Sequence, residues 1–297
     1  MAEIKLFSLN EGVKECTSSE VVLEKELQTL IEQNMETFFG VRFLKSEYAI
    51  TNGRMDSIGI DENNSPVIFE YKRSQNENVI NQGLFYLDWL LDHKADFKLL
   101  VIEKLGMESA DGIDWSVPCV ICIAHDFTKY DLHAVNQMQR NIKLVSYRKY
   151  DNGMLLFEHL NAPNVKPMTE NGVMDSEKNN AQKSHIEKLA AVSDNMKNLY
   201  HSICDFIESF GDDITANQLK LYLAYKKVQN LVCIEIYNKQ ILLFVKLNPE
   251  TVKLESGFTR DMRNIGHYGT GDLQIIIKNA SDFERAKPLL ERAYSEM

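Results

Sequence analysis

The sequence lacks the long apolar stretch that a membrane-spanning helix requires. No run of about 18 apolar residues occurs, and residues 1–12 contain no apolar signal core. The mean hydropathy is −0.29, an ordinary value for a globular protein. We therefore expect a soluble, cytoplasmic protein that does not interact with a membrane.

Cysteine is scarce as well, with five residues and no repeated spacing. An odd number without a pattern argues against a disulfide framework. Cys119 and Cys122 form a Cys-x-x-Cys pair, but they lie in the apolar run Val117–Ala124, which predicts a buried strand. Residues three apart on a strand point to opposite faces, so we do not expect zinc or redox use at this pair.

Positive charge is in deficit, and the deficit is unevenly distributed. The net charge is −10 overall, and residues 1–160 carry 16 Lys and Arg against 25 Asp and Glu. Proteins that coat nucleic acid without specificity are basic, so this charge argues against that class. A nuclease is not excluded, because bound divalent metal partly neutralises an acidic site.

Apolar patterns predict an α/β unit in the first half of the chain. A helix capped by Thr17, Ser18 or Ser19, with Glu20 near its positive end, runs to Phe38. The later elements alternate between strands, helices and a polar loop at 103–115. Strands are expected at 4–9, 41–50, 55–60, 67–71, 97–102, 117–124, 142–147 and 154–157, and helices at 75–92 and 128–139. This order predicts a mixed sheet flanked by helices.

The second half predicts a smaller α+β unit after a linker. Residues 161–184 are polar, aperiodic and rich in asparagine, which is typical of a linker. A long amphipathic helix at 185–210 precedes an antiparallel sheet and a closing helix capped by Ser281. The expected strands are 219–225, 231–237, 241–247 and 273–277. We thus expect domains at 1–160 and 185–297, with the antiparallel sheet of the second between two helices.

The stretch from Gly53 to Asp92 carries candidate chemistry. Asp56 and Glu70 place carboxylates on neighbouring strands, and Lys72 follows Glu70 by two residues, which puts both on one strand face. Magnesium takes one or two carboxylates in proteins, and phosphodiester hydrolysis also needs positive charge near the phosphate. The pattern therefore indicates a metal-dependent phosphodiesterase site.

Residues on the flanking helices add to this candidate site. Gln82 and Tyr86 are four residues apart and share a helical face, from which they can reach a metal-bound water or the scissile phosphate. Glu26, on the first helix, can supply a third acid. An isolated Glu-x-Lys is most often a surface salt bridge, but Asp56 interrupts an apolar strand, where an acid is costly unless it is paired or binds metal. We therefore favour a nuclease-type site, active or relic.

These residues resemble the PD-(D/E)XK nuclease superfamily. The resemblance rests on GRMDSIGID, EYK and QGLFY, with EKELQTLIEQNMETFFG resembling the first helix, and it covers roughly residues 20–150. Within the superfamily, the chain is most similar to the catalytic domain of archaeal and actinobacterial mismatch endonucleases. One departure is Met55, which stands where the superfamily's name has proline.

The resemblance implies a restriction-endonuclease-like fold and a role for each matching residue. Asp56 and Glu70 would be metal ligands for Mg²⁺ or Mn²⁺, and Lys72 the catalytic lysine. Gln82 and Tyr86 match the Gln-x-x-x-Tyr element, and Glu26 matches the acid of the first helix. The implied activity is endonucleolytic cleavage of DNA, in repair or in defence against foreign DNA. The implied substrate is single-stranded, branched or mismatched DNA, and related nucleases often act as homodimers.

The second half resembles a small bacterial domain of unknown function, which supplies a boundary and no chemistry. Arg260, Arg263, His267, Tyr268 and the pair at 226–227 suggest a modest basic and aromatic surface for nucleic acid or a partner.

Alternatives to an active nuclease stay open. The scaffold can serve as a binding or regulatory module without turnover, which the acidic charge favours. The C-terminal domain can also recruit a protein partner, so that the first domain acts only in that complex. A His125-Asp126 pair lacks the companion histidines of a metal phosphohydrolase and is interpreted as a loop.

Overall fold

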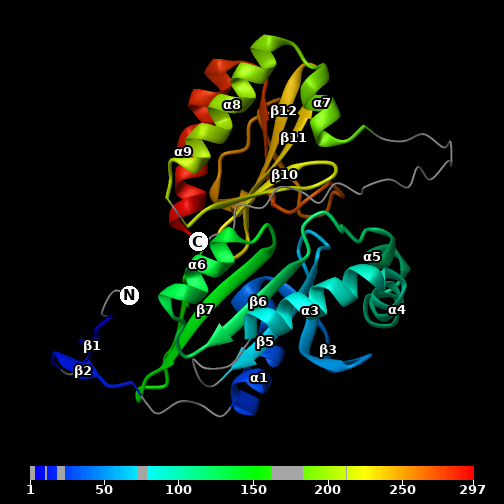
Figure 1. Ribbon diagram of the computed structural model, residues 1–297. Coiled ribbons are helices and arrows are strands. Elements are labelled where there is room, and N and C mark those ends of the chain that lie inside the picture. Colours follow the sequence, from blue (N-terminus) through cyan, green and yellow to red (C-terminus); the bar gives the residue numbers. More distant parts are fainter. Residues whose placement is uncertain (1–3, 11, 19–23, 73–78, 162–182, 212) are drawn as a thin grey trace.

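The computed structural model describes residues 4–10, 12–18, 24–72, 79–161, 183–211 and 213–297, and contains two six-stranded sheets (Figure 1). The predicted linker therefore falls largely outside the described residues. So do the Ser19 cap, Glu20 and the predicted helix start at residues 75–77. Within the described residues, no helix is long and apolar enough to cross a membrane.

The first sheet is mixed, as the sequence predicts. Its order is β3-β4-β5-β6-β7-β8, in which β5, β6 and β7 run parallel and every other neighbouring pair is antiparallel. The strands are β3 (Val41–Ile50), β4 (Gly53–Asp61), β5 (Pro66–Lys72), β6 (Cys119–Ala124), β7 (Asn141–Lys149) and β8 (Leu155–His159).

Helices cover both faces of this sheet. One core lies under α1 (Glu24–Gln33) and α2 (Met35–Phe39). The core on the opposite face is covered by α3 (Val79–Asp92), α4 (Lys94–Leu105), α5 (Met107–Asp111) and α6 (Lys129–Gln137). Cys119 belongs to the first core and Cys122 to the second, which confirms that the Cys-x-x-Cys pair points to opposite faces.

The predicted strand at 97–102 is wrong, because these residues lie within α4. Phe97, Leu100 and Val101 are buried at helical spacing, whereas Leu99 is 64% exposed. A short apolar run does not distinguish a strand from a buried helix. The predicted loop at 103–115 contains the end of α4 and all of α5.

The second sheet is antiparallel throughout, with the order β13-β14-β12-β11-β10-β9. Its strands are β9 (Thr215–Gln218), β10 (Leu223–Lys226), β11 (Asn230–Tyr237), β12 (Gln240–Val245), β13 (Thr259–Asp261) and β14 (Leu273–Ile277). The helices are α7 (His185–Ala191), α8 (Asp194–Glu208), the 3-10 turn η1 (Pro249–Thr251) and α9 (Ala280–Ser295). This unit confirms the predicted smaller α+β fold.

Several details of this unit differ from prediction. β9 and β13 were not predicted, and the strand predicted at 219–225 begins only at Leu223. The single helix at 185–210 is two helices, because Ser193 accepts a hydrogen bond from the Met196 N–H and starts α8 anew. Asn279, not Ser281, caps α9. The sheet does not lie between two helices, as the sequence predicted. Both α8 and α9 pack on the same face of the sheet, in one shared core, and lie side by side in Figure 1.

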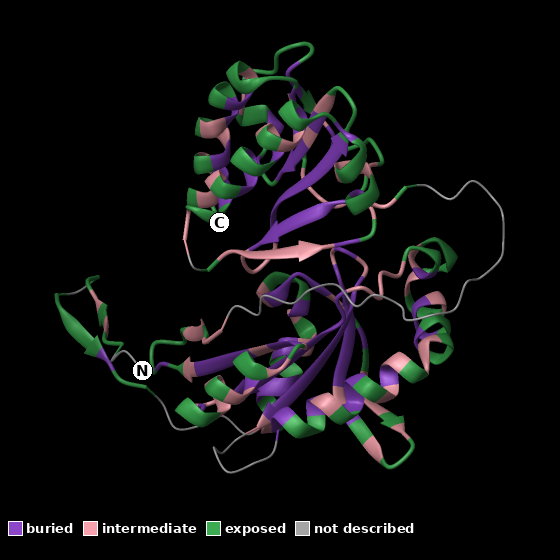
Figure 2. Cartoon of the chain, turned by 45° about the horizontal axis from the view of Figure 1, so that its top comes forward, coloured by how far each residue is buried: buried purple, intermediate pink, exposed green. Residues whose placement is uncertain are grey.

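The other face of the second sheet lies against the first unit. Val117 of the first unit packs with Tyr222, Cys233 and Phe244 of the second. Figure 2 shows the buried strands of both units meeting in this region, with the exposed helix faces turned outward. The contact centres on the β4–β5 turn, where Asn63 exchanges side-chain hydrogen bonds with Asn230 at 2.6 and 3.1 Å.

A two-stranded hairpin, β1 (Leu6–Ser8) and β2 (Lys14–Cys16), lies beside the first sheet. β1 lies within the predicted short strand, whereas β2 was not predicted. The Thr17 hydroxyl donates to Asp151 at 2.6 Å, and Ser18 forms a backbone bridge with Tyr150. The hairpin is therefore attached at the end of β7.

Candidate functional site

The fold brings Asp56 and Glu70 together from adjacent strands. Asp56 lies on β4 and Glu70 on β5, and the Asp56 N–H donates to Glu70 Oε1 at 3.3 Å. The Tyr71 N–H donates to Asp56 Oδ2 at 3.0 Å. Fourteen positions of sequence separate the two acids, yet the antiparallel β4–β5 pairing places them side by side.

Glu70 is held away from water, and Asp56 is half-buried. Glu70 is 1% exposed, and burial together with the nearby Asp56 carboxylate raises the pKa of Glu70 to about 9. Burial also raises the pKa of Asp56, although the Tyr71 N–H opposes that shift. Each carboxylate disfavours ionisation of the other, and a bound divalent cation would stabilise the ionised form of both. Two carboxylates supply oxygen ligands of the kind that a hard divalent cation takes.

Lys72 lies beside this acid pair. It follows Glu70 by two positions at the end of β5, so the two side chains share a face. Its Nζ lies 4.0 Å from Glu24 Oε1 on α1. A lysine here places positive charge next to the carboxylates, as the sequence predicts.

Helix α3 reaches the site because a glycine lets it approach the sheet closely. A Cβ atom at Gly83 would lie 2.6 Å from Val120 Cγ1 on β6. The helix thereby brings the Tyr86 hydroxyl to the Arg54 N–H, which donates to it at 3.5 Å at the start of β4. Gln82 is exposed one turn before Tyr86, and the structure records no bond between Gln82 and the acids.

Replacing Gly83 with leucine should destabilise the protein by about 1–3 kcal/mol, because the side chain would overpack the α3–β6 contact. Chemical denaturation measures the difference. Gln82→Leu is the matched control for stability, since it adds an apolar side chain to an exposed position of the same helix. Equal stability of the two variants would contradict the close-approach argument.

The first helix faces the site through residues that differ from the one predicted. Glu26 is exposed, and its helical spacing turns it away from Glu24 and Gln28. Gln28 is 3% exposed, and its Nε2 donates to the Asp56 carbonyl oxygen at 2.8 Å. Glu32 accepts from the Ser57 hydroxyl at 2.6 Å.

The sequence contained a signal for this inward polar face. Glu24, Gln28 and Glu32 repeat every four residues next to the buried Leu27 and Ile31. Polar residues at that spacing form one helical stripe, which faces β4 and β5 and is buried at Gln28. Across the residues that the structure describes, no cluster of three His, Cys, Asp or Glu side chains could hold a metal. Asp56 and Glu70 are the two acids that the β4–β5 pairing brings together.

The predicted basic and aromatic surface of the second unit is wrong in its main features. Lys226 is 4% exposed and lies 3.2 Å from Asp61 Oδ2 and 3.6 Å from Glu62 Oε1. The Arg263 guanidinium pairs with Asp261, at 2.7 Å. These cations are neutralised by carboxylates, so they form no free basic patch.

Two family models each match a part of the chain. Residues 23–102 match the family model of the endonuclease NucS C-terminal domain. Residues 183–296 match a domain of unknown function, DUF5655. A Haemophilus influenzae protein described only as uncharacterized is 30% identical over 99% of this chain and 100% of its own length.

Solved structures give weaker likenesses. A repair endonuclease from Pyrococcus abyssi is 15% identical with a TM-score of 0.29, and the match covers 48% of this chain and 65% of that chain. An EndoMS–double-stranded DNA complex is 18% identical with a TM-score of 0.26, covering 48% of this chain and 64% of that chain. The matched region thus spans slightly less than two thirds of these relatives.

Proposed function

We propose that this protein is a metal-dependent DNA endonuclease. The chain belongs to the same family as the Haemophilus influenzae protein that it matches over nearly its whole length. The observation that carries the proposal is the pairing of half-buried Asp56 with buried Glu70. The Asp56 N–H lies 3.3 Å from Glu70 Oε1, and Lys72 lies on the same strand face as Glu70. All three residues lie within the part of the chain that matches the NucS C-terminal domain. A Mg²⁺ or Mn²⁺ ion is the proposed cofactor.

The proposed roles follow from position and charge. Asp56 and Glu70 would hold the metal ion, which when bound polarises the phosphate and acidifies a water. Lys72 supplies positive charge next to the negative charge that develops as water adds to phosphorus and a P–O ester bond breaks. Gln82 and Tyr86 would orient the substrate from α3. We propose Glu24 as the acid contributed by α1, in place of Glu26, because its carboxylate faces Lys72.

DNA cleavage with Mn²⁺ or Mg²⁺ tests the proposal, on single-stranded, branched and mismatched substrates. Wild type should cut at least one of them, and Asp56→Ala and Lys72→Ala should each lower the rate by about a hundredfold or more. A wild type that cuts none of these substrates, or variants that cut as well as wild type, would overturn the enzymatic claim.

Manganese titration separates an active nuclease from a non-catalytic binding module on the same scaffold. A competent site binds Mn²⁺ in wild type and loses that binding in Asp56→Ala. A module without turnover binds DNA with no dependence on Asp56 or on metal. A protein partner for the DUF5655 unit is a further proposal. A homodimer is another, and light scattering of the full chain with and without DNA tests it.

A further inference from the structure

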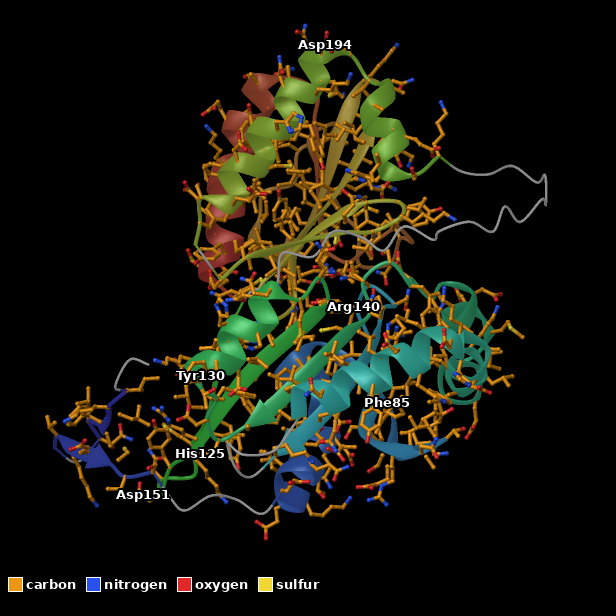
Figure 3. The ribbon with its side chains drawn as sticks, in the orientation of Figure 1. Phe85, His125, Tyr130, Arg140, Asp151 and Asp194 are labelled. Atoms are coloured by element: carbon orange, nitrogen blue, oxygen red, sulfur yellow. The ribbon has the colours of Figure 1, made fainter. Side chains whose placement is uncertain are left out.

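A basic hollow lies beside the proposed catalytic site, where the β1–β2 hairpin meets the ends of β6 and β7. Its volume is about 470 Å³, and its lining includes Lys5, His125, Arg148 and the single acid Glu15. The ring of His125 also packs edge-on against Tyr147, with ring centres 6.1 Å apart. In Figure 3, His125 lies at the same end of the sheet as Asp151, to which Thr17 bonds.

The strand register places this hollow close to Lys72. Lys72 on β5 pairs with Ala124 on β6, and Ala124 pairs with Ser146 on β7. Neighbouring strands are about 4.8 Å apart, so β7 runs roughly 10 Å from Lys72 at this level. Arg148 lies two residues beyond Ser146, on the same strand face, and His125 directly follows Ala124. The hollow therefore begins about two strand spacings from Lys72.

Charge makes the hollow unusual for this unit. Residues 1–160 carry an excess of acids, yet the hollow is lined by one lysine and one arginine, with His125, against one carboxylate. Arg148 is partly exposed, and its guanidinium has no hydrogen bond or ion pair within the described parts of the chain. A guanidinium fork matches the oxygens of a phosphate, and such charge-assisted bonds are stronger than neutral ones.

We propose that this hollow binds a phosphate group of the substrate strand, through Arg148 and His125, close to the cleaved bond. The proposal rests on the proposed nuclease function for the identity of the strand. The phosphate has two sources, an internal diester of a continuous strand or a terminal monoester at a strand end. Substrates with and without a 5′- or 3′-terminal phosphate distinguish the two.

DNA binding by the full chain, measured in EDTA by fluorescence anisotropy, tests the proposal without cleavage. Arg148→Ala should weaken binding about tenfold and reduce the dependence of log Kd on log salt by about one unit. His125→Ala should weaken binding in the same direction. If the hollow holds an internal phosphate, the loss is equal for phosphorylated and unphosphorylated strands. If it holds a terminal phosphate, only phosphorylated strands lose affinity.

Arg140→Ala is the matched control, because Arg140 precedes β7 at its opposite end and pairs with Asp88 at 3.4 Å (Figure 3). The proposal is overturned if Arg148→Ala binds every strand as wild type does, if it loses no more than Arg140→Ala, or if wild type binds none of the strands. Thermal unfolding of each variant shows whether weaker DNA binding reflects the loss of a DNA contact or the unfolding of the protein. If Arg148→Ala loses DNA binding and the wild type never cuts DNA, the phosphate-binding role of the hollow is supported and the proposed nuclease function is rejected.

Discussion

Glu70→Gln should remove metal-dependent cleavage while making the metal-free protein more stable. Loss of a carboxylate that would hold the ion removes several kcal/mol of transition-state stabilisation, which corresponds to about a thousandfold in rate. Glutamine has nearly the same shape and keeps an oxygen that can accept from the Asp56 N–H, so the strand pairing should persist. Cleavage assays with Mn²⁺ measure the first effect.

The gain in stability follows from the environment of Glu70. Its folded-state pKa of about 9 exceeds the ordinary value, so the folded protein binds a proton that the unfolded chain releases above about pH 4.5. Wild-type stability in EDTA should therefore fall as pH rises from about 5 to 9, and the variant should not show that loss. At pH 7 we expect Glu70→Gln to be more stable by about 1–3 kcal/mol.

Denaturation in EDTA and with Mn²⁺ completes this experiment. Manganese should raise the unfolding temperature of wild type and leave that of Glu70→Gln unchanged, because a ligand that binds only the folded state stabilises it. Glu103→Gln, at an exposed position of α4, is the control and should behave as wild type. A Glu70→Gln variant that still gains stability from Mn²⁺ would show that the metal binds elsewhere.

Lys226→Met should destabilise the first unit, although Lys226 belongs to the second. Burial lowers the pKa of Lys226, but the Asp61 and Glu62 carboxylates more than offset burial and hold it above its usual range. Removing one partner of a buried ion pair leaves an uncompensated charge, which costs about 3–5 kcal/mol. The affected carboxylates lie at the turn that joins β4, which carries Asp56, to β5, which carries Glu70.

Tryptophan fluorescence during denaturation measures this effect directly. The chain has two tryptophans, Trp89 and Trp115, and both belong to the first unit. Lys227→Met is the matched control, because Lys227 pairs with Asp213 at the surface, where an ion pair contributes about 0–1 kcal/mol. The triple variant Asp61→Asn, Glu62→Gln, Lys226→Met should recover much of the loss, since no charge is left unpaired.

An unchanged tryptophan transition in Lys226→Met would mean that the two units unfold independently. The DUF5655 unit would then contribute nothing to the stability of the β4–β5 hairpin. A shared loss of stability would assign it a structural role in holding the strands of the proposed site.

Local patterns predicted most of the elements because their causes are local. Alternation and turn residues predicted β4 and β5, and the Glu70–Lys72 spacing placed both side chains on one face. Thr128 was expected to start a helix, and it does so with a full capping box. The predictions failed where burial decides the outcome: residues 97–102 form a helix because their apolar side chains pack on the sheet at helical spacing.

The sequence by itself determined the two folds, the strands of the proposed site and the identity of its acids and lysine, because strand period and turn chemistry act over a few residues. Only the tertiary structure decided which side of α1 meets the site, turning Gln28 and Glu24 inward and Glu26 outward. It also decided that Lys226 is buried against Asp61, and that Arg148 and His125 share a hollow near Lys72. These relations join residues that lie far apart in the sequence, and they depend on how the faces of separate elements pack.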